Sequence, residues 1–181
     1  MTSRATVEGG DRLRLFLALQ LPDDVVDTIE AWQHAVLRGG RIVARDHLHL
    51  TLAFLGSRPA AELDAIVAAL RAGVARVERP RFEVRRYRET RSVAMLVLDD
   101  EGGRATTLAD DVQERLEALA VYRREARPWL PHLTVLRFRE RPRLAPPLPS
   151  LGPFCPSGAA AYLSRLHPSG ARYEVLDSVP L

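Results

Sequence analysis

Two stretches of the chain share one pattern: residues 47–56 read HLHLTLAFLG, and residues 131–137 read PHLTVLR. In each stretch one apolar residue separates a histidine from a threonine. These pairs are His49 with Thr51 and His132 with Thr134. With 5 histidines and 8 threonines among 181 residues, about 0.2 such pairs are expected by chance, although one short motif alone often means nothing. The repeat therefore governs how the rest of the chain is interpreted.

Both motifs have the alternation of a strand with one face in the core. The apolar positions expected to face the core are Leu48, Leu50, Leu52, Phe54, Leu133 and Val135. The opposite face then carries the histidine and threonine of each motif, so each strand presents an imidazole beside a hydroxyl. His47 shares the face of His49 but has no threonine two residues later, and we expect it at the edge of a site or exposed.

The periodicity of the remaining sequence predicts an α+β protein with about seven strands and three helices. Strands are expected at residues 13–21, 48–55, 82–87, 93–98, 133–138, 160–166 and 173–179, the last two forming a hairpin around Pro168, Ser169 and Gly170. Helices are expected at residues 22–37, 63–77 and 104–119. The proline-rich stretch 142–156 is expected to be a surface loop.

The overall composition is that of a soluble globular protein, with 46% apolar and 27% charged residues. No apolar run approaches the roughly 20 residues of a membrane span. We expect a disordered polar tail at residues 1–11, one domain at 12–181 and a cytoplasmic location. Cys155 is the only cysteine, which excludes an internal disulfide and a metal site built from cysteines.

The net charge of +3 is a weak indication of a phosphate-bearing partner. All 26 basic residues are arginine, and the chain contains neither lysine nor asparagine. This bias is more typical of a GC-rich genome than of selection for a phosphate-bearing partner, so each arginine near a site has to be considered separately.

Two imidazoles facing each other across a cleft suit the hydrolysis of a cyclic phosphodiester. One takes a proton from water and the other gives a proton to the leaving ribose oxygen. The ordinary histidine pKa near 6.5 allows one ring to be neutral while the other is charged. The hydroxyls of Thr51 and Thr134 can hydrogen-bond the non-bridging phosphate oxygens. This arrangement requires the two halves of the chain to pack about a pseudo-twofold axis.

No metal or cofactor is expected. Asp46 is the acidic residue nearest to the first motif, and neither motif has metal-ligand spacing. Three alternatives stay open: two ordinary strand histidines, a nucleotide or RNA-end binding module without turnover, and an ester hydrolase with a serine or cysteine nucleophile. The last lacks a Gly-x-Ser-x-Gly motif, and Cys155 has no histidine close to it in the sequence.

The two motifs resemble those of the two-histidine (2H) phosphoesterase superfamily, in its branch of RNA 2′,3′-cyclic phosphodiesterases, also known as 2′–5′ RNA ligases (LigT-like). Residues 14–19 followed by Pro22 resemble the first strand of this family, and residues 164–173 its closing segment. The resemblance implies two pseudo-twofold-related lobes of antiparallel sheet, with outer helices, around a central cleft. It implies hydrolysis of RNA 2′,3′-cyclic phosphate ends to 2′-phosphomonoesters, and 2′–5′ ligation as the reverse reaction.

The resemblance also implies roles for individual residues. His49 would be the proton donor to the leaving 3′ oxygen, His132 the proton acceptor from water, and Arg137 a phosphate contact. Strict alternation places Arg137 on the face opposite His132, so it can take part only if the strand bulges or ends near Leu136. The expected partners are RNA ends or nucleotides with a 2′,3′-cyclic phosphate, with no membrane and no obligate protein partner.

Overall fold

The computed structural model describes residues 11–168 and 170–181, so the predicted tail at residues 1–11 lies outside it except for Asp11, as does Ser169. The described elements are β1 (Arg12–Gln20), α1 (Asp23–Val36), β2 (Arg41–Ile42), η1 (Arg45–His47), β3 (His49–Pro59), η2 (Ala60–Glu62), α2 (Leu63–Val74), β4 (Phe82–Glu89), β5 (Val93–Asp100), η3 (Glu101–Gly103), α3 (Arg104–Ala118), β6 (His132–Arg137), β7 (Gly158–His167) and β8 (Gly170–Pro180). Among these described residues, no helix is long and apolar enough to cross a membrane.

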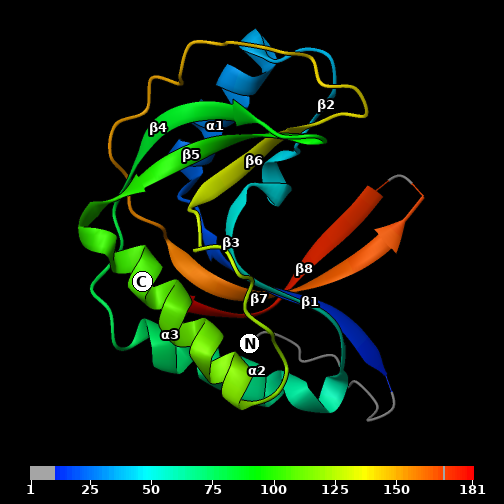
Figure 1. The fold of residues 1–181 in the computed structure, drawn as a ribbon, viewed down its shortest axis with the longest axis vertical. Helices are drawn as coiled ribbons and strands as arrows, with labels where there is room; N and C mark the ends of the chain where they lie inside the picture. The colour runs from blue at the N-terminus through cyan, green and yellow to red at the C-terminus, as the bar shows by residue number, and fades with distance from the viewer. Residues whose placement is uncertain (1–10, 169) are drawn as a thin grey trace.

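The strands form two antiparallel sheets of four strands each, in the orders β3-β1-β7-β8 and β2-β6-β5-β4. Figure 1 shows α2 and α3 together beside the first sheet and α1 behind the second. The chain passes between the sheets several times, because β1 and β3 belong to one and β2 to the other. This interleaving places β3 and β6, the two motif strands, in contact with each other. The predicted α+β class is confirmed.

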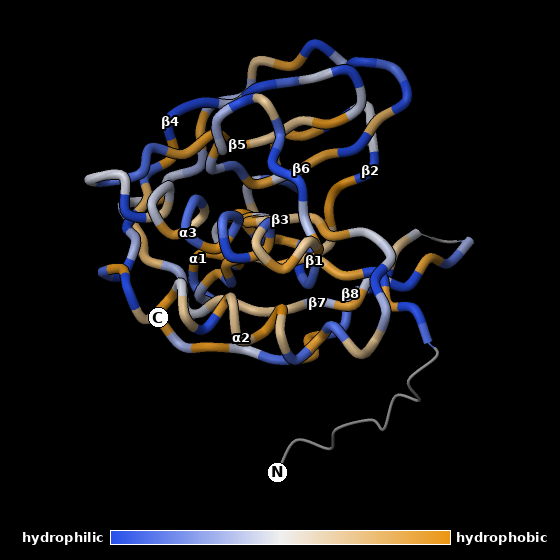
Figure 2. The backbone as a smooth tube through the Cα atoms, turned by 60° about the horizontal axis from the view of Figure 1, so that its bottom comes forward, coloured by the Kyte–Doolittle hydropathy of each residue, from blue (hydrophilic) through white to orange (hydrophobic). Residues whose placement is uncertain are grey.

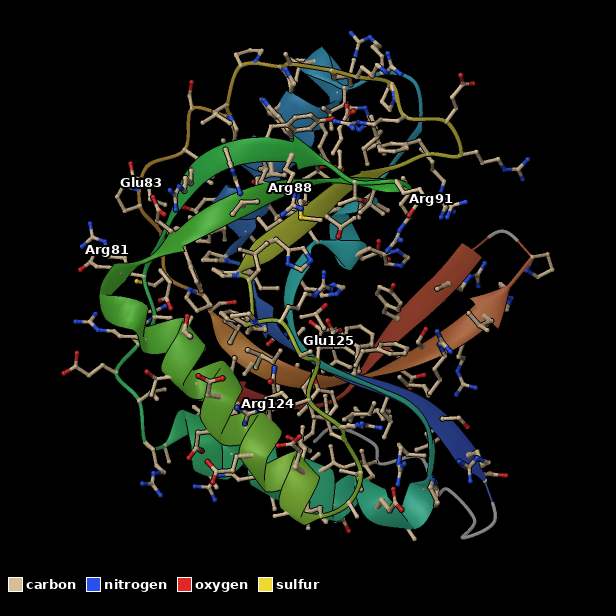
Figure 3. The ribbon with its side chains drawn as sticks, viewed as in Figure 1. Arg81, Glu83, Arg88, Arg91, Arg124 and Glu125 are labelled. Atoms are coloured by element: carbon tan, nitrogen blue, oxygen red, sulfur yellow. The ribbon has the colours of Figure 1, made fainter. Side chains whose placement is uncertain are left out.

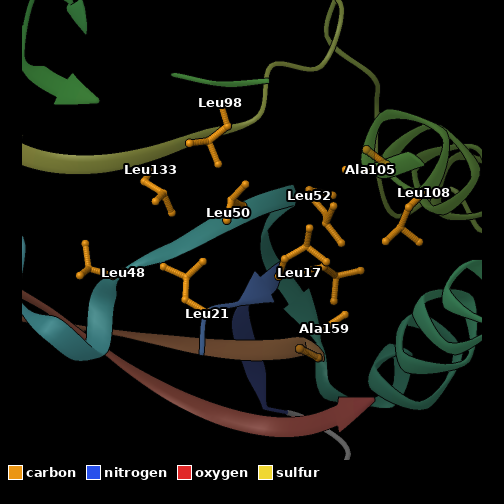
Figure 4. Close-up of a cluster of buried hydrophobic side chains, with 14 of the residues drawn as sticks. Leu17, Leu21, Leu48, Leu50, Leu52, Leu98, Ala105, Leu108, Leu133 and Ala159 are labelled. Atoms are coloured by element: carbon orange, nitrogen blue, oxygen red, sulfur yellow. The ribbon is translucent and has the colours of Figure 1, made fainter. Parts of the chain in front are cut away.

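One hydrophobic core joins the two sheets. Leu17 of β1, Leu50 of β3 and Leu133 of β6 are fully buried in the same cluster (Figure 4). Burying one such leucine stabilises the fold by about 1.5–3 kcal/mol. In Figure 2 the hydrophobic segments concentrate in the central strands, whereas the outer connections are largely hydrophilic. The core therefore packs against one face of both motif strands. The opposite faces, which carry the histidine and threonine of each motif, are left free.

Some observed elements differ locally from the predicted ones, and β3 extends to Pro59 rather than ending at residue 55. The two-residue strand β2 was not predicted, because a segment that short shows no periodicity. The proline-rich loop is anchored at Phe154, which is buried and pairs with Phe82 of β4. Helix α2 ends at Val74, three residues before the predicted end.

Candidate active site

The first motif lies at the start of β3, where a β-bulge changes the alternation. Ala18 of β1 pairs with Thr51 and Leu17 pairs with Ala53, so Leu52 is an extra residue. Leu52 and Ala53 are both buried, and Phe54 returns to the face of Thr51 with 48% of its surface exposed. The prediction that Phe54 faces the core is wrong, because the bulge at Leu52 moves Phe54 to the other side of the strand.

The second motif lies in β6 and has the same irregularity at the same distance from its threonine. Met95 of β5 pairs with Thr134 and Ala94 pairs with Leu136, so Val135 is extra. Val135 and Leu136 are both buried, and Arg137 is exposed on the face of Thr134. Strict alternation predicted Arg137 on the face opposite His132, and this is wrong. The bulge at Val135 brings Arg137 to the face of Thr134.

Both bulges are held by a buried glutamine from a neighbouring helix. Gln113 of α3 donates its side-chain N–H to the carbonyl of Leu52 at 2.8 Å. Gln33 of α1 donates in the same way to the carbonyl of Val135 at 2.8 Å, and this carbonyl also accepts the backbone N–H of Val43 at 3.1 Å. A bulge leaves backbone groups without a ladder partner, and a buried unpaired carbonyl costs about 1–3 kcal/mol. The glutamines therefore fix the backbone behind both motifs.

A cavity of about 680 Å³ brings together all the residues predicted for the site. It is lined by His49, Thr51, His132, Thr134 and Arg137. The two motifs, more than eighty positions apart in the chain, thus face one volume large enough for a nucleotide.

The cavity is strongly basic. The arginines among its described lining residues are Arg14, Arg41, Arg137 and Arg172. Asp46 is the one carboxylate in that lining, and it lies 4.0 Å from the ring of His47. Such an excess of positive charge in a concave site favours an anionic ligand. Sequence reasoning did not select Arg14, although the alternation of β1 places it on the same face as Phe16, which also lines the cavity.

Aromatic rings surround His49 on the cavity floor. Its ring centroid lies 4.9 Å from that of Phe16, 5.6 Å from that of Tyr173 and 5.9 Å from that of Tyr162. Burial lowers the pKa of His49 to about 4. A hydrogen bond to the backbone of His47 opposes this change, whereas positive charge on neighbouring groups adds to it. His49 is therefore uncharged in the free protein at neutral pH.

The ring of His132 is oriented by one hydrogen bond to the backbone. Its Nδ1 lies 2.8 Å from the carbonyl of Leu130, and a carbonyl can only accept, so Nδ1 carries the hydrogen. The neutral ring then keeps the lone pair on Nε2. His132 therefore has the tautomer that a proton acceptor needs at Nε2.

Of the other three histidines, His47 lies at the edge of the site, as the sequence suggested. His47 is half-buried at the cavity edge, with its ring centroid 4.2 Å from that of Tyr173. His34 and His167 are exposed, on α1 and at the end of β7. Among the described residues, no three histidine, cysteine, aspartate or glutamate side chains come together as a potential metal site.

Comparison with known proteins gives matches along most of the chain. A family model described as the 2'-5' RNA ligase superfamily matches residues 21–166, a range that includes both motifs. The RNA 2',3'-cyclic phosphodiesterase of Thermus thermophilus is 35% identical over 182 residues, covering 93% of this chain and 90% of that protein.

Solved structures show the same similarity. The crystal structure of TT0787 of Thermus thermophilus has a TM-score of 0.78 at 31% identity, covering 93% of this chain and 98% of that one. Escherichia coli LigT complexed with NADP+ has a TM-score of 0.78 at 27% identity, covering 95% of this chain and 99% of that one.

Proposed function

Because the chain belongs to the 2'-5' RNA ligase superfamily, we propose that it hydrolyses 2′,3′-cyclic phosphates at RNA ends to 2′-phosphomonoesters. One observation carries the proposal: His49 and His132 line the same cavity, each followed two residues later by a threonine. Two imidazoles on one cavity can perform both proton transfers of this reaction. The name of the Thermus relative supports RNA with a cyclic phosphate as the substrate class.

In the proposed reaction His132 is the base. Its Nε2 accepts a proton from water while Nδ1 stays bonded to the carbonyl of Leu130. The water oxygen forms a bond to phosphorus, the bond between phosphorus and O3′ breaks, and His49 gives its proton to O3′. The phosphate remains on O2′, and water is the only other reactant.

The charge of the phosphate is matched by groups on both motifs. We assign the hydroxyls of Thr51 and Thr134 and the guanidinium of Arg137 to the non-bridging oxygens. Negative charge grows on these oxygens in the transition state, so donors already in place lower its free energy more than that of the substrate. The basic lining of the cavity supports this assignment.

Phe54 supports a nucleotide substrate over a simple phosphate ester. Its exposed ring lies on the cavity, with the guanidinium carbon of Arg14 4.7 Å from the ring centroid. An exposed aromatic face beside a phosphate site is suited to stacking of a nucleobase. The complex of E. coli LigT with NADP+ shows that this relative binds a nucleotide.

The deciding experiment is turnover of a dinucleotide that ends in a 2′,3′-cyclic phosphate, with the product identified as a 2′- or 3′-phosphate. His49→Ala and His132→Ala should each lower kcat by about 10²–10⁴-fold, the usual effect of losing a general acid or base. His34→Ala, on the exposed side of α1, is the matched control and should keep the wild-type rate. A normal rate in either motif variant would disprove the assignment.

Two further arms of this experiment separate the competing functions. Binding of the substrate without turnover by the wild-type protein would identify a binding module. Treatment with EDTA should leave the rate nearly unchanged, because the imidazoles perform both proton transfers. Loss of activity on chelation, restored by a divalent cation, would instead indicate metal-assisted hydrolysis.

A further inference from the structure

A second cavity, of about 520 Å³, adjoins the first. Both cavities are lined by Thr51, Phe54 and His132. The second cavity is bordered by β4 and by the connection between α3 and β6, where Figure 3 labels Arg88 and Glu125. It therefore leads from the proposed reaction centre toward β4, the edge strand of its sheet.

A third cavity, of about 570 Å³, lies at this edge of the sheet. Arg88 lines both the second and the third cavity, and Arg86 lines the third. Met95 of β5 pairs with Arg88 on one side and with Thr134 on the other, so these three side chains lie in one row across the same face of the sheet. Two strand spacings, ~10 Å, separate the backbones of Arg88 and Thr134. Shared lining residues thus connect the reaction centre with the arginines of β4.

Two arginines of β4 give this path a positive charge that no carboxylate neutralises. Arg86 and Arg88 are exposed, and neither has a carboxylate partner among the described residues. The carboxylates that line the second and third cavities are each paired with another arginine: Glu125 with Arg127, and Glu89 with Arg141. Unpaired guanidinium groups beside a phosphate site favour a ligand with repeated negative charge, such as a nucleic acid backbone.

The second cavity also offers aromatic side chains to a nucleobase. Trp129 and Tyr122 are half-buried in its lining, and the indole N–H of Trp129 donates to the carbonyl of Thr51 at 2.9 Å. Phe54, the proposed stacking surface for the terminal base, borders the same cavity. The next base of a bound strand therefore comes within reach of Trp129 and Tyr122. Aromatic rings along a positively charged groove are the common way of binding single-stranded nucleic acid.

We propose that the second and third cavities bind the RNA strand on the 5′ side of the cyclic phosphate, so that the enzyme selects oligonucleotide ends over mononucleotides; this rests on the proposed hydrolysis. The nucleoside next to the terminal one stacks on Trp129 and Tyr122. Arg88 binds the phosphate that joins these two nucleotides, and Arg86 binds the next phosphate in the 5′ direction. These groups are bound equally in the substrate and in the transition state, so they lower KM rather than raise kcat.

The test measures KM for three substrates that share one terminal nucleotide: the nucleoside 2′,3′-cyclic phosphate, the dinucleotide and the trinucleotide. The KM of the dinucleotide should be lower than that of the mononucleotide by about tenfold or more, because it gains one charged contact and one stacked base. Arg88→Ala should raise KM for the dinucleotide about tenfold and leave that for the mononucleotide unchanged. Arg86→Ala should raise KM for the trinucleotide alone. Arg85→Ala is the matched control, because Arg85 is exposed on the same strand but lines neither cavity.

A change in the substrate tests the stacking without altering the protein. A dinucleotide whose 5′ nucleotide lacks its base keeps the phosphate for Arg88 but has nothing to stack on Trp129 and Tyr122. Its KM should lie between those of the mononucleotide and the complete dinucleotide. A KM equal to that of the complete dinucleotide would overturn the role of the two aromatic residues.

Three results would overturn the binding path as a whole. Equal KM values for the mononucleotide and the dinucleotide with the wild-type protein would show that the 5′ strand is not bound, and would leave the proposed hydrolysis intact. A rise of KM for the mononucleotide in Arg88→Ala would place Arg88 at the cyclic phosphate instead. Equal effects of Arg88→Ala and Arg85→Ala would indicate general attraction by positive charge. Failure of the proposed function would appear separately, as absence of hydrolysis with every substrate.

Discussion

Binding of an anionic phosphate in the first cavity should raise the pKa of His49. In the free protein, burial lowers this pKa to about 4, and positive charge on His47, Arg137 and His132 contributes in the same direction. An uncharged imidazole keeps one N–H, but this group is far too weak an acid to protonate the leaving oxygen, whereas an imidazolium can do so. If His49 is the acid, it must therefore become protonated when the substrate binds.

The expected size of the change follows from the charge of the ligand. A single negative charge about 4 Å from an imidazolium, at an effective dielectric constant of about 20, stabilises the charged ring by ~4 kcal/mol, or ~3 pKa units. This would bring the pKa of His49 to about 7. Arg137 attracts the same anion and offsets part of the effect, so ~3 units is the upper end of the expected rise.

Titration of the histidine ring signals by NMR measures this change directly. Spectra are recorded across pH for the free protein and at saturation with a nucleoside 2′-phosphate, and the His49→Gln variant assigns the signal. The midpoint for His49 should rise by about 2–3 units, while that of the exposed His34 should not move. A midpoint that stays near 4 in the complex, in a protein active at pH 7, would refute the reasoning. The neutral ring of His49 would then be the base, and His132 the proton donor.

Three other outcomes are expected. Gln113→Met should lower the free energy of unfolding by about 1–3 kcal/mol by leaving a buried carbonyl unpaired, and should lower kcat more than the exposed control Glu114→Met, as measured by urea denaturation and turnover. Arg137→Met should raise KM for the cyclic phosphate and raise the pKa of His49 in the free protein, and an unchanged KM would exclude a phosphate contact. Burial raises the pKa of Glu89. Hydrogen bonds from loop N–H groups and from Arg141 lower this pKa by more than burial raises it, so the net pKa is below its ordinary value of 4.5. The ionised carboxylate therefore stabilises the fold above that pH, and the advantage of wild type over Glu89→Gln in urea should shrink as pH falls below about 4.5; an advantage independent of pH would contradict this account.

The sequence predicted the elements of the site better than their exact orientation. The His-x-Thr repeat selected both histidines and threonines, because alternation along a strand is a strong local signal. The resemblance to the 2′–5′ RNA ligase family is confirmed by the match over residues 21–166. The face of Phe54 was wrong because Leu52, the residue at the bulge, is an ordinary leucine with no sequence mark of a bulge.

The remaining residues of the cavity depend on contacts far apart in the chain. Arg14 comes from β1, Arg41 from the short strand β2 and Arg172 from β8. Their meeting depends on the strand orders of both sheets, which no local pattern in the sequence specifies. Gln33 and Gln113 were missed for a related reason. Glutamine is common in helices. Its role can be recognised only when the structure shows that its side chain donates to the carbonyl of a bulge residue.

The two bulges also bring different residues to the cavity from two motifs that are alike. In each motif the third residue after the threonine returns to the cavity, and this residue is Phe54 in one motif and Arg137 in the other. An aromatic face and a guanidinium cannot exchange roles, so we expect a nucleotide to bind in one orientation, with its base toward Phe54 and its phosphate toward Arg137. In the proposed reaction, that orientation directs the leaving oxygen to one histidine and the incoming oxygen to the other. The surroundings of the rings add to the difference, because His49 is enclosed by aromatic residues whereas Nδ1 of His132 is bonded to the carbonyl of Leu130. The proposed division into acid and base thus follows from the residues that the bulges bring to the cavity, rather than from the His-x-Thr motifs, which are alike.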